Sequence, residues 1–276
     1  MEDRIQGAKE TPDPKSEEGP WHFRTLEGGA GYLVMPRWDL YDNKWDWKAY
    51  LAKVFTQLNT AKSPGLIIDL RGTEGGIDVG EEIATYLIKQ PEKFDQYKLY
   101  TRFLKVSPDL KPYLDTWDRS FDDWTEWSDK EPKYNALAHN DLYRMRRFDG
   151  PDRTDKQPNS IHFNGKVAVL VDNSNSSATF QFDQMMQVHH LATLIGEPTG
   201  GNQRGINGSA FYFLYLPNSK LEVDLPMVGA LPDTRLPDAG LTPDIFVRPS
   251  AQDIATGHDV VLERAVKFVV GASGTP

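Results

Sequence analysis

The sequence predicts an α/β fold whose core strands are mostly parallel. Short runs of continuous apolar residues, such as LIIDL and KVAVLVD, alternate along the 276 residues with longer stretches whose apolar side chains recur every three to four positions. The first pattern is typical of strands covered on both faces, and the second is typical of helices that lie on a sheet. Alternation of strand and helix favours parallel pairing with right-handed crossovers.

The first half of the chain is expected to alternate regularly between strand and helix. Its opening segment is charged and rich in proline and lacks the apolar stretch of a signal peptide, so we expect a disordered tail over residues 1–20. The ordered chain should begin near Trp21, and Asp46 is a suitable N-cap for the first helix. The expected elements are a strand at 31–35, a helix at 47–58, a strand at 66–70, a helix at 79–88 and a strand at 98–106.

The second half departs from this order in two places. Residues 108–160 are rich in tryptophan and in charge of both signs, and we expect an insertion or lid here, within one large domain over residues 21–276. Its aromatic side chains suit either a ligand contact or a small satellite cluster. Two period-2 segments around a turn at 217–219 predict a β-hairpin. The remaining expected elements are strands at 166–172 and 192–196 and a terminal helix at 252–270.

Composition excludes several classes of function. The net charge is −9, from 40 acidic and 31 basic residues, and no Lys/Arg cluster marks a face that could neutralise phosphates, so we expect no nucleic-acid partner. The sequence contains no run of about 18 apolar residues, so it predicts no membrane-spanning helix. The absence of cysteine excludes a thiol nucleophile, disulfides and thiolate metal sites. Since His189 and His190 lack the spacing of a zinc motif, we expect no metal and no cofactor.

Chemistry-bearing residues follow two of the predicted core strands. In open α/β sheets, sites gather at the carboxyl ends of the strands. The first strand is followed by RGTEGG, in which Gly75 and Gly76 would let backbone N–H groups approach a ligand. The second is followed by NSNSSAT, where a serine would begin the next helix. One segment offers a nucleophile and the other offers donors for an oxyanion, although serines at this position are also ordinary N-caps.

Four segments in order carry a resemblance to a known family. GLIIDLRGTEGG, KVAVLVDNSNSSATFQFDQMMQ, ATLIGEPTGGN and GLTPDIFV together resemble the core of the C-terminal processing, or tail-specific, serine peptidases and their tricorn-core relatives. The resemblance covers residues 31–249. It implies a crotonase-like α/β fold of the kind shared with the caseinolytic proteases. It also implies hydrolysis of peptide bonds in a peptide or protein substrate through an acyl-enzyme.

The resemblance also implies roles for individual residues. The family's nucleophile falls on Ser177, because Ser177-Ala178-Thr179 matches the family's Ser-Ala-Ser triplet. The oxyanion hole then consists of the backbone N–H of Ala178 and that of Gly75 or Gly76. Two preorganised donors of this kind contribute about 3 to 4 kcal/mol each to transition-state stabilisation.

Other residues near these motifs are expected to hold the loops rather than to react. Ser174 and Ser176 would be loop or capping residues beside Ser177. Asp69 and Arg71 lie at the end of the strand expected at 66–70 and are expected to hold the loop that follows it.

The general base departs from the family pattern. The tail-specific branch has a lysine where this chain has Asn202, and an amide cannot accept the serine's proton. The chain therefore resembles the tricorn-like branch, whose base is a histidine from a segment before the core. In that branch a glutamate is the further acidic residue of the site. It aligns at or beside Pro237 in this chain, which leaves Asp238 as a substitute. Asn202 and Asp238 are thus candidate accessory residues. The candidate bases are His22, His139, His162, His189, His190 and His258, and the expected position of His189 and His190 at the far end of the helix argues against both.

Three functions follow as alternatives. The first is a serine peptidase core that lacks an amino-terminal segment supplying the base. The second is a non-catalytic module on the same fold that binds a peptide or a lipophile, as the interphotoreceptor retinoid-binding modules of this superfamily do. The third is an acyl-transfer hydrolase acting on esters. The family is periplasmic or secreted, the sequence itself determines neither compartment nor oligomeric state, and a homo-oligomer stays open.

Overall fold

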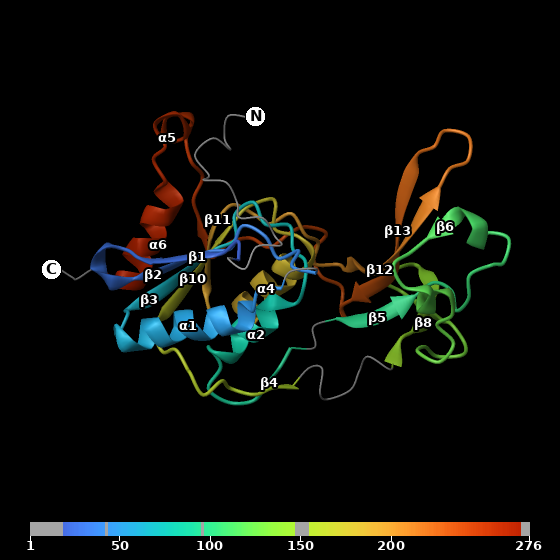
Figure 1. The fold of residues 1–276 in the computed structure, drawn as a ribbon, viewed down its shortest axis with the longest axis horizontal. Coiled ribbons are helices and arrows are strands. Elements are labelled where there is room, and N and C mark those ends of the chain that lie inside the picture. The colour runs from blue at the N-terminus through green and yellow to red at the C-terminus, as the bar shows by residue number, and fades with distance from the viewer. Residues whose placement is uncertain (1–18, 42–43, 95–96, 147–154, 272–276) are drawn as a thin grey trace. The chain divides into compact units, whose positions relative to one another are not determined.

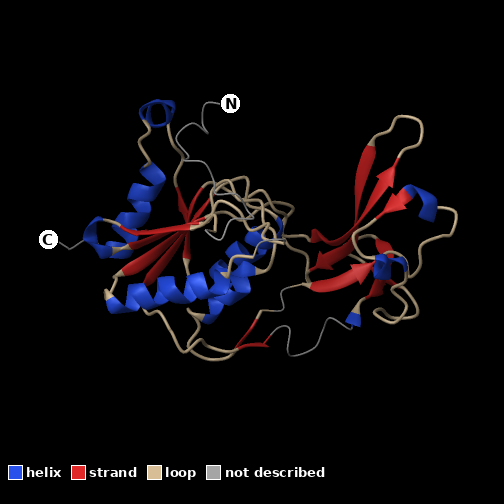
Figure 2. Cartoon of the chain, viewed as in Figure 1, coloured by secondary structure: helices blue, strands red, loops and turns tan. Residues whose placement is uncertain are grey.

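The computed structural model describes residues 19–41, 44–94, 97–146 and 155–271. These residues form two compact units. The first unit contains the described residues up to Pro91 together with 157–201 and 240–271, and the second contains those of 92–156 and 202–239. The first unit combines helices with strands, whereas the second consists mostly of strands (Figure 2). All but the last two residues of the expected tail lie outside the described residues.

The first unit is built on a six-stranded sheet. Its strands, in spatial order, are β1 (His22–Thr25), β2 (Gly31–Val34), β3 (Gly65–Asp69), β10 (Lys166–Val171), β11 (Thr193–Gly196) and β14 (Ile245–Phe246). Only β1 is antiparallel to its neighbour, and the other pairs are parallel. The parallel strands expected from the continuous apolar runs are therefore confirmed. Their burial on both faces explains why those runs carry no polar alternation.

Helices cover both faces of this sheet (Figure 1). On one face, Val261, Ala265 and Val269 of one helix pack against Ile67 and Leu170. On the other face lies the first helix, whose N-cap is Asp46, as expected: its carboxylate accepts a hydrogen bond from the N–H of Ala49. The helices are α1 (Trp47–Thr60), α2 (Val79–Thr85), α4 (Ser177–Val188), α5 (Ala251–Thr256) and α6 (Val260–Val270), with a short 3-10 turn, η2, at Glu27–Gly29.

Three expected elements differ in extent or place. The helix expected at 79–88 ends at Thr85. The helix expected at 252–270 is two helices, because Gly257 has a left-handed φ of +69° that ends α5 and Asp259 then caps α6. The strand expected at 98–106 is only β5 (Lys98–Thr101), and it belongs to the antiparallel sheet of the second unit. A strand of four residues is too short for its side-chain pattern to show which sheet it joins.

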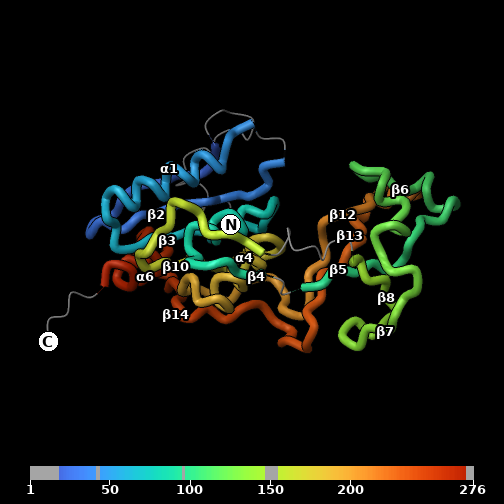
Figure 3. The backbone as a smooth tube through the Cα atoms, turned by 90° about the horizontal axis from the view of Figure 1, so that it is seen from below, coloured from blue at the N-terminus to red at the C-terminus, as the bar shows by residue number. Residues whose placement is uncertain are grey.

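The second unit is an antiparallel sheet organised around a long hairpin. The expected hairpin is confirmed, with β12 and β13 paired over most of their length and β5 beside β13 (Figure 3). The strands, in spatial order, are β6 (Leu114–Asp115), β12 (Ile206–Tyr215), β13 (Glu222–Leu231), β5, β8 (Asn140–Arg144) and β7 (Lys133–Asn135). A separate pair joins β4 (Glu92–Lys93) to β9 (Asp155–Lys156), and 3-10 turns lie at η3 (Lys111–Tyr113) and η4 (Arg119–Asp122).

The aromatic residues of segment 108–160 form a cluster of their own. Trp124 and Met145 are buried with Val228 of the hairpin, and the rings of Phe121 and Trp124 stack with centroids 5.3 Å apart. This is the satellite cluster that the sequence left as one alternative. Trp117, by contrast, has 60% of its surface exposed. That the segment acts as a lid stays a prediction.

Candidate active site

Two loops leave the same edge of the parallel sheet side by side. They follow β3 and β10, which are adjacent parallel strands in which Asp69 is paired with Leu170. Because both strands end at this level, residues 70–78 and residues 172–176 begin at neighbouring points of the carboxyl edge. This is the location at which sites form in parallel α/β sheets.

One buried side chain joins these loops to a third. Asn175 has no exposed surface, and its amide nitrogen donates hydrogen bonds to the carbonyl oxygens of Leu70 at 2.7 Å and Thr73 at 3.1 Å. Its own backbone carbonyl accepts hydrogen bonds from the N–H groups of Gly200 and Gly201. Sequence reasoning missed Asn175, because its partners lie about a hundred positions away and no local pattern shows them. It fixes the geometry of three loops at once.

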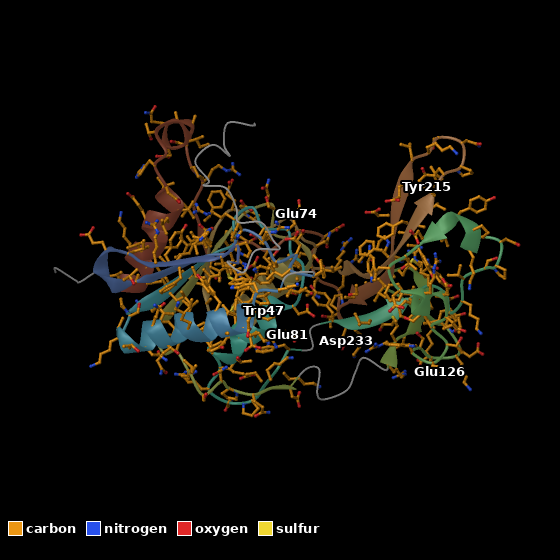
Figure 4. All side chains as sticks on the ribbon, viewed as in Figure 1. Trp47, Glu74, Glu81, Glu126, Tyr215 and Asp233 are labelled. Atoms are coloured by element: carbon orange, nitrogen blue, oxygen red, sulfur yellow. The ribbon has the colours of Figure 1, made fainter. Side chains whose placement is uncertain are left out.

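The three serines of the second loop differ in what holds them. The Ser176 hydroxyl donates to the carbonyl oxygen of Glu74 at 2.9 Å, a residue labelled in Figure 4, and therefore ties the two loops together. The backbone N–H of Ser174 donates a hydrogen bond to the carboxylate of Asp172 at 2.9 Å. Ser177 is exposed, and within the described residues its hydroxyl has no hydrogen-bond partner. Among the described residues the Ser174 hydroxyl has no hydrogen-bond partner either, but Ser174 is only partly exposed, whereas Ser177 is exposed.

Ser177 also has an uncommon backbone conformation. Its φ is +50°, in the left-handed region that costs a non-glycine residue about 1 to 2 kcal/mol. It follows Ser176, which is extended, and is the first residue of α4. Strained residues at a sharp strand-to-helix turn are characteristic of nucleophile positions, because the turn projects the side chain away from the backbone.

Gly75 lies against this turn. A Cβ at Gly75 would be 2.9 Å from the backbone nitrogen of Ala178, 2.9 Å from the carbonyl oxygen of Ser176 and 3.1 Å from Cβ of Ser177. The N–H of Ala178 belongs to the first turn of α4 and therefore has no acceptor within the helix. The glycine backbone and the start of α4 thus meet beside Ser177, which brings together three of the residues expected to form the site.

Gly76 has a different environment. It forms a parallel bridge with Trp38, and a Cβ at this position would be 2.1 Å from the Trp38 carbonyl oxygen. The next N–H along the chain, that of Ile77, donates to the same oxygen at 2.9 Å. Glycine is required at position 76 by the close approach of another backbone segment.

Asp69 and Arg71 are joined by hydrogen bonds at the end of β3, where the first loop begins. The Arg71 guanidinium makes two hydrogen bonds to Asp69 and two to Asp259, the N-cap of α6. Tyr32 donates to Asp69 at 2.6 Å, and burial, then the Asp69 charge, raises the pKa of this tyrosine. Burial opposes ionisation of Asp259, but the hydrogen bonds and charge of Arg71 outweigh it and lower the pKa of that carboxyl. These contacts match the holding role expected for Asp69 and Arg71.

The histidines of the first unit lie away from Ser177. His162 precedes β10 and its carbonyl accepts from Asn59 near the end of α1, so it lies at the amino edge, a strand length of about 20 Å from the carboxyl edge. His22 is level with Asp69 in the sheet register, but β1 is three strands from β10, about 14 Å across. Neither histidine can contact Ser177 in this arrangement.

The other histidines have structural surroundings. His189 is the C-cap residue of α4, and His190 follows it at a φ of +53°, so the expected placement of this pair at the far end of the helix is confirmed. His258 lies between α5 and α6 rather than inside a terminal helix, and its ring nitrogens contact Asp253 and Glu263 at 2.9 Å each. His139 belongs to the second unit, at the turn between β7 and β8.

The two accessory candidates contact each other. The Asn202 amide donates to Asp238 at 2.8 Å, and the other carboxylate oxygen of Asp238 accepts from Arg204 at 2.6 Å. All three residues belong to the second unit. The pairing engages Asp238 fully with local partners.

A buried carboxyl group on α4 was also missed. Asp183 has no exposed surface, and within the described residues neither of its carboxylate oxygens has a hydrogen-bond partner. Burial, reinforced by the charge of Asp172, raises the pKa of Asp183 well above its usual range. The signal was available, because an aspartate between Phe182 and Met185 stands within an apolar stretch of the helix.

Comparisons with known proteins agree with this architecture. The crystal structure of a "putative peptidase" from Parabacteroides merdae matches with 18% identity and a TM-score of 0.53, covering 93% of this chain and 67% of that one. Mature CPAF complexed with lactacystin matches with 16% identity and a TM-score of 0.60, covering 96% and 59%. The photosystem II D1 C-terminal processing protease matches with 15% identity and a TM-score of 0.49, covering 92% and 53%. At these identities the first two matches, with TM-scores above 0.5, show the fold alone.

The chain thus spans between about half and two thirds of the length of these solved structures. No curated protein matches it. In the part of the chain that the structure describes, no helix is both long and apolar enough to cross a membrane. The model of peptidase family S41 matches residues 29–247, which is well over half of the sequence. The chain therefore belongs to peptidase family S41, a family of serine-type peptidases.

Proposed function

We propose that this chain is the catalytic core of a serine peptidase and that Ser177 is its nucleophile. The observation that carries this proposal is the left-handed, exposed Ser177 at the start of α4, with Gly75 directly against it. The Ser176 hydroxyl is engaged with Glu74, and Ser174 is less exposed than Ser177 and lies outside α4, so Ser177 is the serine best placed for the role.

The proposed reaction proceeds through an acyl-enzyme. The Ser177 oxygen attacks the carbonyl carbon of the scissile peptide bond while its proton passes to a base. The backbone N–H of Ala178 and that of the glycine pair hold the resulting oxyanion. Collapse of the tetrahedral intermediate breaks the C–N bond, the base returns the proton to the leaving amine, and water then releases the acyl group by the same steps.

The environments of the two glycines favour Gly75 as the donor. Gly75 abuts Ala178 and Ser177, whereas Gly76 is packed against the backbone of Trp38. Gly75 therefore supplies the second donor of the proposed oxyanion hole, and Gly76 maintains the course of the loop.

The proposed base comes from a segment that this sequence does not contain. Support comes from the positions of His22 and His162, and from Asn202, which occupies the position of the lysine in the tail-specific branch and donates to Asp238 instead. The test is kcat/KM of the isolated chain on a fluorogenic peptide, with His22→Ala and His162→Ala beside it. We expect a rate at least about a hundredfold below that of an amino-terminally extended form. Robust turnover that either histidine variant abolishes would place the base inside this chain.

Ser177 itself is tested by labelling with a fluorophosphonate. We expect Ser177→Ala to abolish labelling, and Ser174→Ala and Ser176→Ala to keep it within about tenfold, because only the nucleophile forms the covalent bond. Equal losses at all three positions would refute the assignment. Labelling of Ser177 together with turnover of short-chain esters but not casein would favour the ester hydrolase.

A non-catalytic binding module is the second candidate, and the placement of the first unit's histidines favours it. A serine without a base is a weak nucleophile at neutral pH. If the chain binds peptides or lipophiles, remains unlabelled at Ser177 and gains no activity from an amino-terminal extension, this second function replaces the first.

A further inference from the structure

The second unit contains a cavity of about 260 Å³ that is separate in sequence from the catalytic loops. It is formed by strands β5, β8 and β7 and by the segment before β7. Its lining residues are Lys98, Tyr100, Asp129, Lys133, Tyr134, Asn135, Leu142, Arg144 and Arg146. Every one of them belongs to the second unit.

Positive charge dominates this lining. Four of the lining side chains are cationic and one, Asp129, is acidic. Asp129 is paired with Arg146 at 2.6 Å, and at the rim Lys98 is paired with Asp233, labelled in Figure 4. Counting Asp233 with the lining, the cations still exceed the acids by two. This excess occurs in a chain whose net charge is −9.

One of these cations is held in a fixed orientation. Arg144 is 8% exposed, its guanidinium donates to the carbonyl oxygen of Leu99 at 2.9 Å, and it lies 5.2 Å from the centre of the Tyr100 ring. A preorganised guanidinium binds a carboxylate with little additional loss of side-chain entropy, and its planar donors match the two oxygens.

The cavity wall is also a sheet edge. In the second unit's sheet, β7 is the last strand and is paired on one side with β8. Lys133, Tyr134 and Asn135 form this strand and line the cavity as well. Extended peptides bind open strand edges through main-chain hydrogen bonds, and adjacent pockets select their side chains.

We propose that this cavity and the edge of β7 together bind an extended peptide segment that carries carboxylate side chains. The cations receive the carboxylates, and Tyr134 and Leu142 offer apolar surface between them. A peptide fits better than a nucleic acid, because the negative charge of the whole chain repels a polyanion whereas a few carboxylates need only the local excess. The site does not depend on the chemistry of Ser177.

The test measures binding with the Ser177→Ala chain, so that no peptide can be cleaved. Fluorescence anisotropy would compare a labelled glutamate-rich peptide with its glutamine counterpart, its lysine counterpart and a single-stranded DNA of equal length. We expect the glutamate peptide to bind at least about tenfold more tightly than the glutamine peptide, because several partly accessible charge pairs are lost together. Binding should weaken as salt is raised.

Charge reversal within the cavity identifies the site. Lys133→Glu should raise Kd for the glutamate peptide about tenfold, because an attraction becomes a repulsion. The matched control is Lys220→Glu, the same charge change on an exposed residue of the β12–β13 turn, which should leave Kd within about twofold. Circular dichroism and the Tm of both variants establish that they are folded. Equal effects of the two substitutions, equal binding of the glutamate and glutamine peptides, preference for DNA, or absence of binding would each overturn the proposal.

Discussion

The two units hold their loops by different means. In the first, buried hydrogen bonds of neutral groups join the loops around Ser177, beside the partly buried ion pairs of Arg71: Asn175 bonds to Leu70 and Thr73, and the hydroxyl of Thr179 donates to Thr73 at 3.0 Å. In the second, surface ion pairs such as Lys111 with Asp122 recur. Buried bonds are costly to break and insensitive to salt, whereas exposed pairs contribute little and are screened. The difference shows where the molecule needs positional precision.

Among the substitutions that test this comparison, Asn175→Ala is expected to have the largest effect. The substitution removes three hydrogen bonds of this buried side chain, those to the carbonyl oxygens of Leu70 and Thr73 and that from the N–H of Asp172, so we expect a loss of about 3 to 4 kcal/mol in the free energy of unfolding. Urea denaturation measures it. The control is Asn173→Ala, because Asn173 is exposed in the same loop and its loss should cost less than about 0.5 kcal/mol. Equal costs would show that Asn175 does not organise the loops.

Alanine substitutions at two glycines with positive φ distinguish steric crowding from backbone strain as causes of destabilisation. Gly76→Ala introduces a Cβ 2.1 Å from the Trp38 carbonyl oxygen, whereas a Cβ at Gly72, where φ is +82°, meets nothing within 4 Å. We expect Gly72→Ala to cost about 1 kcal/mol from its left-handed backbone, and Gly76→Ala to cost about 2 kcal/mol more. Thermal unfolding measures both. Indistinguishable Tm values would contradict the packing described around Trp38.

Asp183 gives the first unit a dependence on pH. The pKa of Asp183 is raised in the folded state, so the unfolded chain releases this proton first, and the free energy of unfolding falls as the pH rises from the ordinary aspartate pKa of 3.8 toward the folded pKa. Asp183→Asn removes this contribution. In that window the free energy of unfolding of the variant should therefore rise relative to that of the unsubstituted chain by at most about 1.4 kcal/mol per pH unit. Urea unfolding from pH 4 to pH 7 measures the difference. A constant difference across this range would refute the assignment.

The smallest expected effect comes from the second unit. Lys111 and Asp122 are 3.0 Å apart, and 49% of the lysine side chain is exposed. We expect Lys111→Ala to change the free energy of unfolding by less than about 1 kcal/mol, and the change to shrink in 1 M salt, where the screening length is about 3 Å. A larger, salt-independent cost would remove the contrast between the two units.

Local sequence patterns predicted helices and strands better than they predicted which strands pair with one another. The strands β3 and β10 followed from continuous apolar runs, and Asp46 followed from the helix that it caps. The sheet to which β5 belongs did not follow, because four residues are too few to separate a continuous apolar run from a period-2 pattern. The break at Gly257 was overlooked, although a glycine within a helical pattern is a known signal for a helix end.

The candidate site was predicted in outline only. Motif order directed attention to Ser177, Gly75 and Gly76, and their roles stay predictions until labelling is measured. The different surroundings of the two glycines could not be foreseen, since Trp38 approaches Gly76 from a distant part of the sequence. The distance of His162 from the site also depends on the register of the sheet rather than on sequence spacing.

The left-handed backbone of Ser177 has an evolutionary consequence. Glycine adopts a φ of +50° without the steric cost that serine bears. A lineage that no longer needed to cut peptides would therefore become more robust by a single replacement at this position, and the fold would be kept while the reaction was lost. On the proposed assignment of Ser177 as the nucleophile, cleavage and stability thus make opposite demands on this one residue.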